Sequence, residues 1–194
     1  RRSSDLAATV EAFGGLDVLV NNASTNVGGQ LETLTDEQLI ERFMGKTLAS
    51  MRLCRAALAY LRKANGGRIV CIGGSSARSP NKTSLPSGLG NSSLANFVKH
   101  FSNDVAPDGI TVNIIHPPFT KTHRYTGRVA ARAAERGLSL AAAEASFAAE
   151  FPIGRVIEPS DIAPMVLFLA SRHASAITGQ ALAIDGGATP YVAY

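Results

Sequence analysis

Short, almost wholly apolar segments alternate along this chain with long segments whose apolar residues recur every three or four positions. The short segments are predicted strands, and they lie at 18–20, 68–72, 110–115 and 181–184. The long segments are predicted helices, and they lie at about 36–64, 87–105 and 159–171, with two shorter helices between 125 and 150. Each connection is long enough to cross over a sheet, so this order predicts parallel strands with helices on both faces. The sequence therefore predicts an α/β fold with a doubly wound parallel sheet.

The first long helix has clear signals at both ends. Thr35 is followed three residues later by Gln38, which is a capping-box pattern, and Gly66 favours termination. The first strand, at 18–20, contains only Val and Leu, a composition typical of a strand buried on both faces of a parallel sheet. We therefore expect a helix over about 36–64 that packs beside a fully buried strand.

The composition excludes several classes of protein. The chain has 194 residues, of which 45% are hydrophobic, so one domain over 1–194 with a sizeable core is expected. No apolar run approaches the ~18–20 residues that a membrane span needs, so no membrane partner is expected. The net charge is +4, but the 19 Lys and Arg are scattered, which argues against a nucleic-acid partner. Cys54 and Cys71 are expected to be buried thiols in a reducing compartment, and the histidines show no metal-ligand spacing, so no metal is expected.

The carboxyl ends of three predicted strands carry the residues best suited to ligand binding. The segments 21–24, 73–76 and 117–122 are rich in Gly, Ser, Asn, Thr or Pro. In sheets of this kind ligands bind at the carboxyl ends of the strands. One site formed by these three segments is therefore expected.

The same strand ends carry motifs that match a known family. Five matching segments follow one another in register, at 17–24 (close to LVNNAG), 67–72, 112–117, 177–180 and 185–187. In these segments the chain resembles the short-chain dehydrogenase/reductase superfamily over essentially its whole length. The insert at 125–155, with the sequence Phe-Pro-Ile-Gly-Arg at 151–155, is similar to the 3-oxoacyl-[acyl-carrier-protein]-reductase-like subgroup.

This resemblance implies a Rossmann-like fold and the NAD(P)-dependent oxidation or reduction of an alcohol/carbonyl pair. The implied partner is a small-molecule substrate, with a 3-oxoacyl-like compound as the candidate, and the implied cofactor is either NAD or NADP. The resemblance also implies a cytoplasmic protein that forms a homodimer or homotetramer through the two long helices, 36–64 and 87–105. The insert at 125–155 is expected to be a helical flap over the substrate.

The family begins with a strand and a glycine-rich TGxxxGxG turn, which holds the cofactor's pyrophosphate at a helix N-terminus. No such motif occurs in this sequence. We therefore expect about two N-terminal βα units, roughly 60 residues, to be missing from this sequence, either because the protein lacks them or because the sequence covers only part of it. Because the family's choice between NAD and NADP is made in that region, the cofactor preference stays open.

The cofactor-binding residues that the resemblance implies come from all three strand ends. They are Asn22, Ala23, Ser24, Ile72, Gly73, Pro117, Phe119, Thr120 and Thr122. Ser24 and Pro118 each replace a glycine of the family pattern. A purely structural role is the alternative, in which Asn22 would only stabilise the end of the strand through hydrogen bonds.

The family's catalytic Asn, Ser, Tyr and Lys are all replaced in this chain. In register with the motifs, Lys46 takes the Asn position, Gly74 the Ser position beside Ser75, Ser87 the Tyr position, and Asn91 the Lys position. A serine hydroxyl is a far weaker acid than a tyrosine, and Asn91 carries no charge that could lower its pKa. The candidate catalytic residues are accordingly Lys46, Ser75, Ser87 and Asn91.

Two hypotheses follow from these replacements. The first is a reductase that works without the family's tetrad, in which Lys46 supplies an electrostatic role. The second is a non-catalytic relative that serves as a nucleotide-binding or structural subunit. Ser87 and Asn91 would then be helix-start residues, and Lys46 would be a solvated lysine. His116 is expected to be a hydrogen-bonded structural histidine, with a place in the cleft as the alternative.

Overall fold

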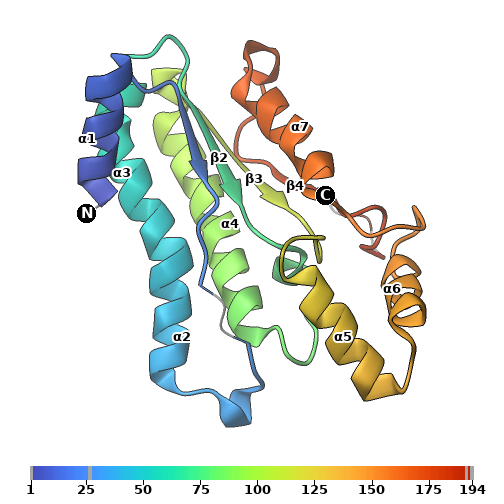
Figure 1. Cartoon of the computed structure of the whole chain (residues 1–194). Helices are drawn as coiled ribbons and strands as arrows, with labels where there is room; N and C mark the ends of the chain where they lie inside the picture. Colours follow the sequence, from blue (N-terminus) through green and yellow to red (C-terminus); the bar gives the residue numbers. More distant parts are fainter. Residues whose placement is uncertain (1, 26–27, 191, 193–194) are drawn as a thin grey trace.

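The computed structural model of the protein describes residues 2–25, 28–190 and 192. Its strands are β1 (Val18–Asn21), β2 (Arg68–Ile72), β3 (Thr111–His116) and β4 (Ala181–Ala183). Its α-helices are α1 (Arg2–Phe13), α2 (Asp36–Phe43), α3 (Ala49–Leu61), α4 (Leu85–Val105), α5 (Tyr125–Arg136), α6 (Leu140–Ala148) and α7 (Pro159–Ala170). The strands are parallel and lie in the order β1-β2-β3-β4 (Figure 1). The predicted α/β fold with a parallel sheet is confirmed.

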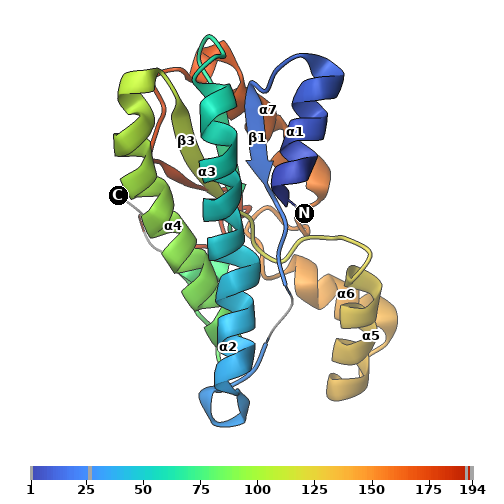
Figure 2. The same cartoon turned by 90° about the vertical axis from the view of Figure 1, so that its left-hand side faces the viewer.

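Helices cover both faces of this sheet. Helices α3 and α4 pack on one face and α7 packs on the other, while α1 packs against α3 beside the edge strand β1 (Figure 2). Strand β2 faces both layers, because Ile69 and Cys71 join the core under α3 and α4, while Val70 packs with Leu169 of α7. All four of these side chains are fully buried. The centre of the sheet therefore has the continuous apolar pattern of a doubly wound fold.

The first strand does not have the burial that its composition predicts. Leu19 and Asn21 are buried, but Val18 and Val20 are 37% and 44% exposed. The expectation of burial on both faces is therefore wrong. The reason is that β1 is the edge strand, and on the α7 side no helix of the described residues covers it.

The first long helix is interrupted by a π-helical turn, Met44–Leu48, between α2 and α3. A side chain at Gly45 would overlap Thr25, so glycine lets the segment after β1 pass close to the helix there. The wider turn directs Lys46 and Thr47 into the interior, where both are buried. Such turns frequently mark functional sites.

The start of α2 has the predicted capping box. The backbone N–H of Gln38 donates to Thr35 Oγ1 at 3.4 Å, and the backbone N–H of Thr35 donates to Gln38 Oε1 at 3.0 Å. Thr35→Ala removes the first bond and is expected to lower the free energy of unfolding by about 1 kcal/mol. Chemical denaturation measures this loss. Thr126→Ala, at an exposed position in the first turn of α5, is the control and is expected to cause no loss.

The segment after β3 forms a small helical unit with a core of its own. Helices α5 and α6 are separated at Gly137, which has the left-handed conformation (φ 61°), as the predicted break requires. Tyr125, Val129 and Phe147 are buried together with neighbouring residues of this unit. Figure 1 shows both helices beyond the carboxyl ends of the strands, beside the expected site. Among the described residues, no helix has the length and apolar character that crossing a bilayer requires.

Candidate functional site

A cavity of about 490 Å³ lies at the carboxyl ends of β1, β2 and β3. Its wall is formed by Val20, Asn22, Ile72, Gly73, Gly74, Pro117, Pro118, Thr120, Thr122, Pro159, Ile162, Ala163 and Val166. Most of these residues are apolar or glycine, and the polar side chains are those of Asn22, Thr120 and Thr122. The cavity lies at the edge of the sheet where the sequence predicts the site.

Backbone hydrogen bonds continue past the ends of β2 and β3 and fix this wall. The N–H of Gly73 donates to the carbonyl of Ile115 at 2.7 Å, and the N–H of Ser75 donates to the carbonyl of Pro117 at 2.8 Å. The two segments therefore stay side by side after the strands end. As a result, the glycines at 73 and 74 present bare backbone to the cavity.

Six of the nine predicted cofactor-binding residues line this cavity. They are Asn22, Ile72, Gly73, Pro117, Thr120 and Thr122. Ala23 lines a separate cavity of about 60 Å³, and the hydroxyl of Ser24 accepts a hydrogen bond from Arg42. Phe119 packs on Tyr125 and Phe147 of the helical insert, with ring centroids 5.7 and 4.9 Å apart. The structure thus brings the three strand ends together, but it places these last three residues beside the cavity.

The four predicted catalytic residues lie behind or beside the cavity wall. None of Lys46, Ser75, Ser87 and Asn91 lines the cavity, whereas Gly74 does. Asn91 is only 4% exposed, and its Nδ2 donates to Ser76 Oγ at 3.1 Å. Ser87 is half-buried in the first turn of α4, and Ser75 begins a short 3-10 turn directly after the two glycines.

Lys46 is buried, with 3% of its surface exposed, so the alternative of a solvated lysine is wrong. Its Nζ donates to the carbonyl of Ile72 at the end of β2. The pKa of the Lys46 ammonium is lowered to about 8, mainly by burial and also by the positive charge of Arg42, while Cys71 has the opposite effect. A lysine with this pKa can both hold and release a proton near neutral pH.

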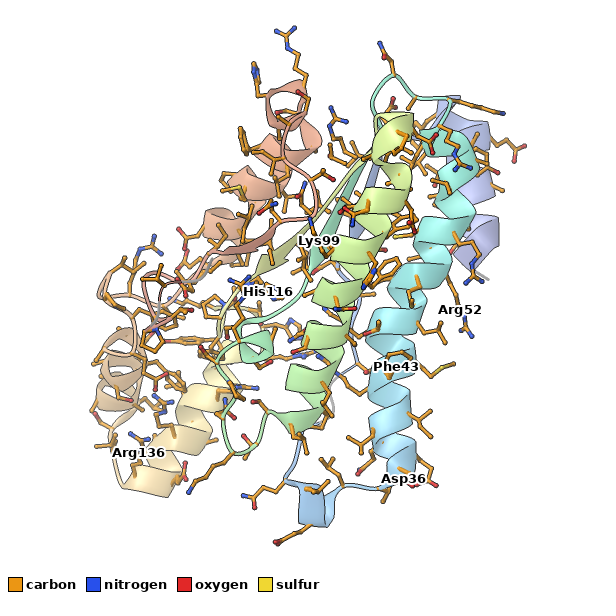
Figure 3. All side chains as sticks on the ribbon, turned by 180° about the vertical axis from the view of Figure 1, so that it is seen from behind. Asp36, Phe43, Arg52, Lys99, His116 and Arg136 are labelled. Atoms are coloured by element: carbon orange, nitrogen blue, oxygen red, sulfur yellow. The ribbon has the colours of Figure 1, made fainter. Side chains whose placement is uncertain are left out.

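His116 lies at the end of β3, and the sequence leaves open whether it is a structural histidine or part of the cleft. It is 3% exposed, and its Nδ1 lies 3.1 Å from the amide nitrogen and 3.0 Å from the carbonyl oxygen of Gly74. Its Nε2 is buried and has no hydrogen-bond partner among the described residues. The pKa of the imidazole is lowered to about 4, mainly by burial. The bond to Gly74 raises this pKa, and the charges of Arg78 and Lys46 lower it. The ring is therefore neutral at pH 7. Figure 3 shows His116 in the interior, at the end of the sheet that faces the helical insert.

Comparison with known proteins identifies the family to which this site belongs. Residues 4–189 match the family model described as Enoyl-(Acyl carrier protein) reductase. The NADPH-dependent reductase BacG of Bacillus subtilis is 33% identical over 174 residues, which span 90% of this chain and 67% of BacG. The chain belongs to the short-chain dehydrogenase/reductase family.

Other members of the family are similar over the same region. The 3-oxoacyl-[acyl-carrier-protein] reductase FabG of Vibrio cholerae is 31% identical over 94% of this chain and 70% of FabG. The crystal structure of YwfH, an NADPH-dependent reductase of bacilysin biosynthesis, superposes with a TM-score of 0.91 at 30% identity, over 98% of this chain and 74% of YwfH. The actinorhodin polyketide ketoreductase with NADPH superposes with a TM-score of 0.90 at 30% identity, with the same coverage. The prediction of an NAD(P)-dependent oxidoreductase is confirmed at the level of this family.

The residues that line the cavity of about 490 Å³ fit the nicotinamide half of NAD(P). Gly73 and Gly74 leave a flat backbone surface, and Ile72 and Pro117 add an apolar wall for a planar ring. The exposed carboxamide of Asn22 can bond a ribose hydroxyl. Thr120 Oγ1 donates to the carbonyl of Pro118 at 3.0 Å and keeps its lone pairs free for a carboxamide N–H. The described residues include no glycine-rich turn of the TGxxxGxG type for the pyrophosphate.

Proposed function

We propose that this chain reduces the carbonyl group of a small, 3-oxoacyl-like substrate at the cavity formed by the ends of β1, β2 and β3. The hydride for this reaction would come from bound NADPH. The observation that carries the proposal is the combination, in one cavity of about 490 Å³, of a flat apolar wall with the polar side chains of Asn22, Thr120 and Thr122. The printed names of BacG, FabG and the actinorhodin ketoreductase support the reaction class and the substrate class.

The chain's own residues have three tasks in this reaction. Ile72 and Pro117 exclude water from one face of the cavity, and Asn22 and Thr120 orient the bound ring by hydrogen bonds. The hydroxyls of Ser75 and Ser87 lie beside the cavity, at the start of their helical turns, and are the candidates to bond a substrate oxygen that extends past the cavity wall. The proton that the oxygen receives has to come from another group, because a serine hydroxyl is too weak an acid.

The whole chain, 1–194, acts as one domain in which the insert at 125–155 covers the substrate. The separate core of α5 and α6 supports an insert that moves as a unit. The domain assembles into a homodimer or homotetramer through its two long helices. Exposed apolar side chains support this assembly, since Ile40 and Phe43 of α2 are 60% and 44% exposed and Leu89 of α4 is 56% exposed. The unpaired, buried thiols of Cys54 and Cys71 support a cytoplasmic protein.

The test is NADPH oxidation with an acetoacetyl thioester, followed together with NADPH binding by fluorescence titration. Asn22→Ala is expected to weaken NADPH binding about tenfold, because one hydrogen bond contributes about 1 kcal/mol or slightly more. Asn65→Ala, an exposed asparagine after α3, is the matched control and is expected to bind NADPH as the unmodified chain does. Equal affinities for the two variants would contradict the placement of the cofactor in this cavity.

A second candidate function is that of a non-catalytic subunit, and the replaced tetrad favours it. Gly74, Ser87 and Asn91 lack the acid and the charge that the family's reaction uses. This subunit would bind NADPH, or partner chains, without turnover of any carbonyl compound. The same pair of measurements separates the two functions, because binding without oxidation supports the subunit and binding with oxidation supports the reductase.

A further inference from the structure

Three polar side chains that are nearly fully buried converge on Gly73 and Gly74, directly behind the wall of the cavity. Lys46, Asn91 and His116 are 3%, 4% and 3% exposed. They come from three separate elements, the π-helical turn, α4 and β3. Lys46 reaches the end of β2 through the carbonyl of Ile72, and His116 contacts the backbone of Gly74. This cluster is too polar to be part of the hydrophobic core.

The two glycines allow these side chains to lie across the backbone. A Cβ at Gly73 would be 2.6 Å from His116 Nδ1, and a Cβ at Gly74 would be 2.6 Å from Asn91 Nδ2. Asn91 Oδ1 and His116 Nε2 are buried and have no partner among the described residues. An unpaired buried polar atom is destabilising. Each of these two atoms can therefore form one more hydrogen bond.

The ammonium group of Lys46 has no acidic partner in this cluster. The charged or titratable groups that act on it are Arg42 of α2, Cys71 of β2 and His116 of β3, and none is a carboxylate. A buried ammonium without a counter-charge destabilises a fold, and a methionine of similar length would fill the same space. The position of Lys46 is therefore poorly explained by stability.

By the family resemblance, Lys46 stands where the family has an Asn, and Asn91 stands where the family has a Lys. The two residue types are therefore swapped between these two positions. The two elements that carry them are in contact. Thr47 Oγ1 donates to the carbonyl of Gly90 at 3.0 Å, and a Cβ at Gly90 would lie 3.9 Å from Lys46 Cβ. One ammonium and one carboxamide are thus retained at the end of β2, with the ammonium supplied from the opposite helix.

We propose that Lys46 supplies the proton for carbonyl reduction at this site, and that Asn91 and His116 hold in place the Gly73–Gly74 backbone that follows Ile72, the residue bonded by Lys46. This inference rests on the proposed function. In the reaction, hydride adds to the carbonyl carbon and the proton from Lys46 reaches the oxygen, so the ketone is reduced to an alcohol and NADPH is oxidised to NADP⁺. The neutral amine then regains a proton from solvent. Lys46 is the proton donor in this scheme, and Asn91 and His116 are positioning residues.

The variants that test this role are Lys46→Met, the exchange Lys46→Asn with Asn91→Lys, and Lys63→Met as control. Lys63 is an exposed lysine just after α3. Lys46→Met is expected to lower kcat about 100-fold or more, as the loss of a general acid does. Its melting temperature is expected to stay the same or rise. The exchange variant, which returns the ammonium to α4, is expected to recover part of the lost rate, and Lys63→Met is expected to change neither quantity.

The pH profile gives a readout that a structural role would not change. The rate of reduction is expected to fall as the pH rises through about 8, where Lys46 loses its proton, and this inflection is expected to disappear in Lys46→Met. NMR titration of ¹³Cε-labelled lysine is expected to show one amine that titrates near that pH and is missing in Lys46→Met.

A Lys46→Met variant that keeps the rate and the pH profile would overturn this inference but not the proposed function. An amine at the ordinary lysine pKa would do the same. An unmodified chain that neither binds NADPH nor reduces the thioester would overturn the proposed function and this inference together.

Discussion

Replacement of Gly73 by alanine is expected to lower the free energy of unfolding by about 1–3 kcal/mol. The added Cβ would lie 2.6 Å from His116 Nδ1 and 3.0 Å from Ile114 Cδ1, both closer than a Cβ contact allows. His116 cannot retreat into solvent, because it is buried and its Nδ1 is held at the backbone of Gly74. The φ of Gly73 lies outside the left-handed region, so the loss measures this contact and no backbone strain.

A double-mutant cycle with His116→Ala tests the cause of this loss. In the His116→Ala background the ring is gone, so Gly73→Ala is expected to cost less by about 0.5–3 kcal/mol. Gly127→Ala is the matched control, since a Cβ at this exposed position of α5 meets no atom within 4 Å and alanine favours a helix. It is expected to stabilise the protein. The same cost for Gly73→Ala in both backgrounds would show that His116 is not the obstacle.

The same contact argument applies to Gly74, which the family resemblance predicts to take the serine position. A Cβ there would be 2.6 Å from Asn91 Nδ2, and Asn91 is itself buried and bonded to Ser76. A side chain at position 74 would therefore require the Asn91 carboxamide to shift.

Features set by neighbouring residues could be predicted from the sequence. The capping box of Thr35 and Gln38 begins α2, β2 has the expected bounds at 68–72, and Gly137 separates α5 from α6. Each of these depends on hydrogen bonds or dihedral preferences within a few residues. The position of the site at the strand ends was also predictable, because it follows from strand order alone.

Features that depend on contacts between distant segments could not be predicted. The close approach of Thr25 to Gly45 in the π-helical turn brings together residues 20 positions apart. The exposure of Val20 depends on which helices cover each face of the sheet, and the apolar composition of β1 does not indicate this. The partners of Lys46 likewise become visible only when β2 and the π-helical turn are placed side by side. The site's cavity wall was therefore predictable, but the buried cluster behind it was not.

The stability of the protein is expected to fall by about 3 kcal/mol between pH 6.5 and pH 4 because of His116. Burial lowers the pKa of this imidazole from 6.5 to about 4, against the opposing effect of its bond to Gly74 and with a smaller contribution from Arg78 and Lys46. The unfolded chain therefore binds a proton in this range that the folded chain does not bind, so unfolding is favoured as the pH falls. At about 1.4 kcal/mol per pKa unit, the gap between the two values gives this magnitude.

The contribution of His116 can be separated from that of the carboxylates by measuring a difference. The free energy of unfolding is compared between the unmodified chain and His116→Gln at a series of pH values from 7 to 4. Glutamine keeps a polar group at Gly74 but cannot be protonated, so the difference is expected to change by about 3 kcal/mol across this range. His100→Gln, at an exposed position of α4, is the matched control and is expected to keep the pH dependence of the unmodified chain. A difference that stays constant with pH would mean that folding does not lower the pKa of His116, so the buried cluster would gain a second positive charge beside Lys46 at the acid end of this range.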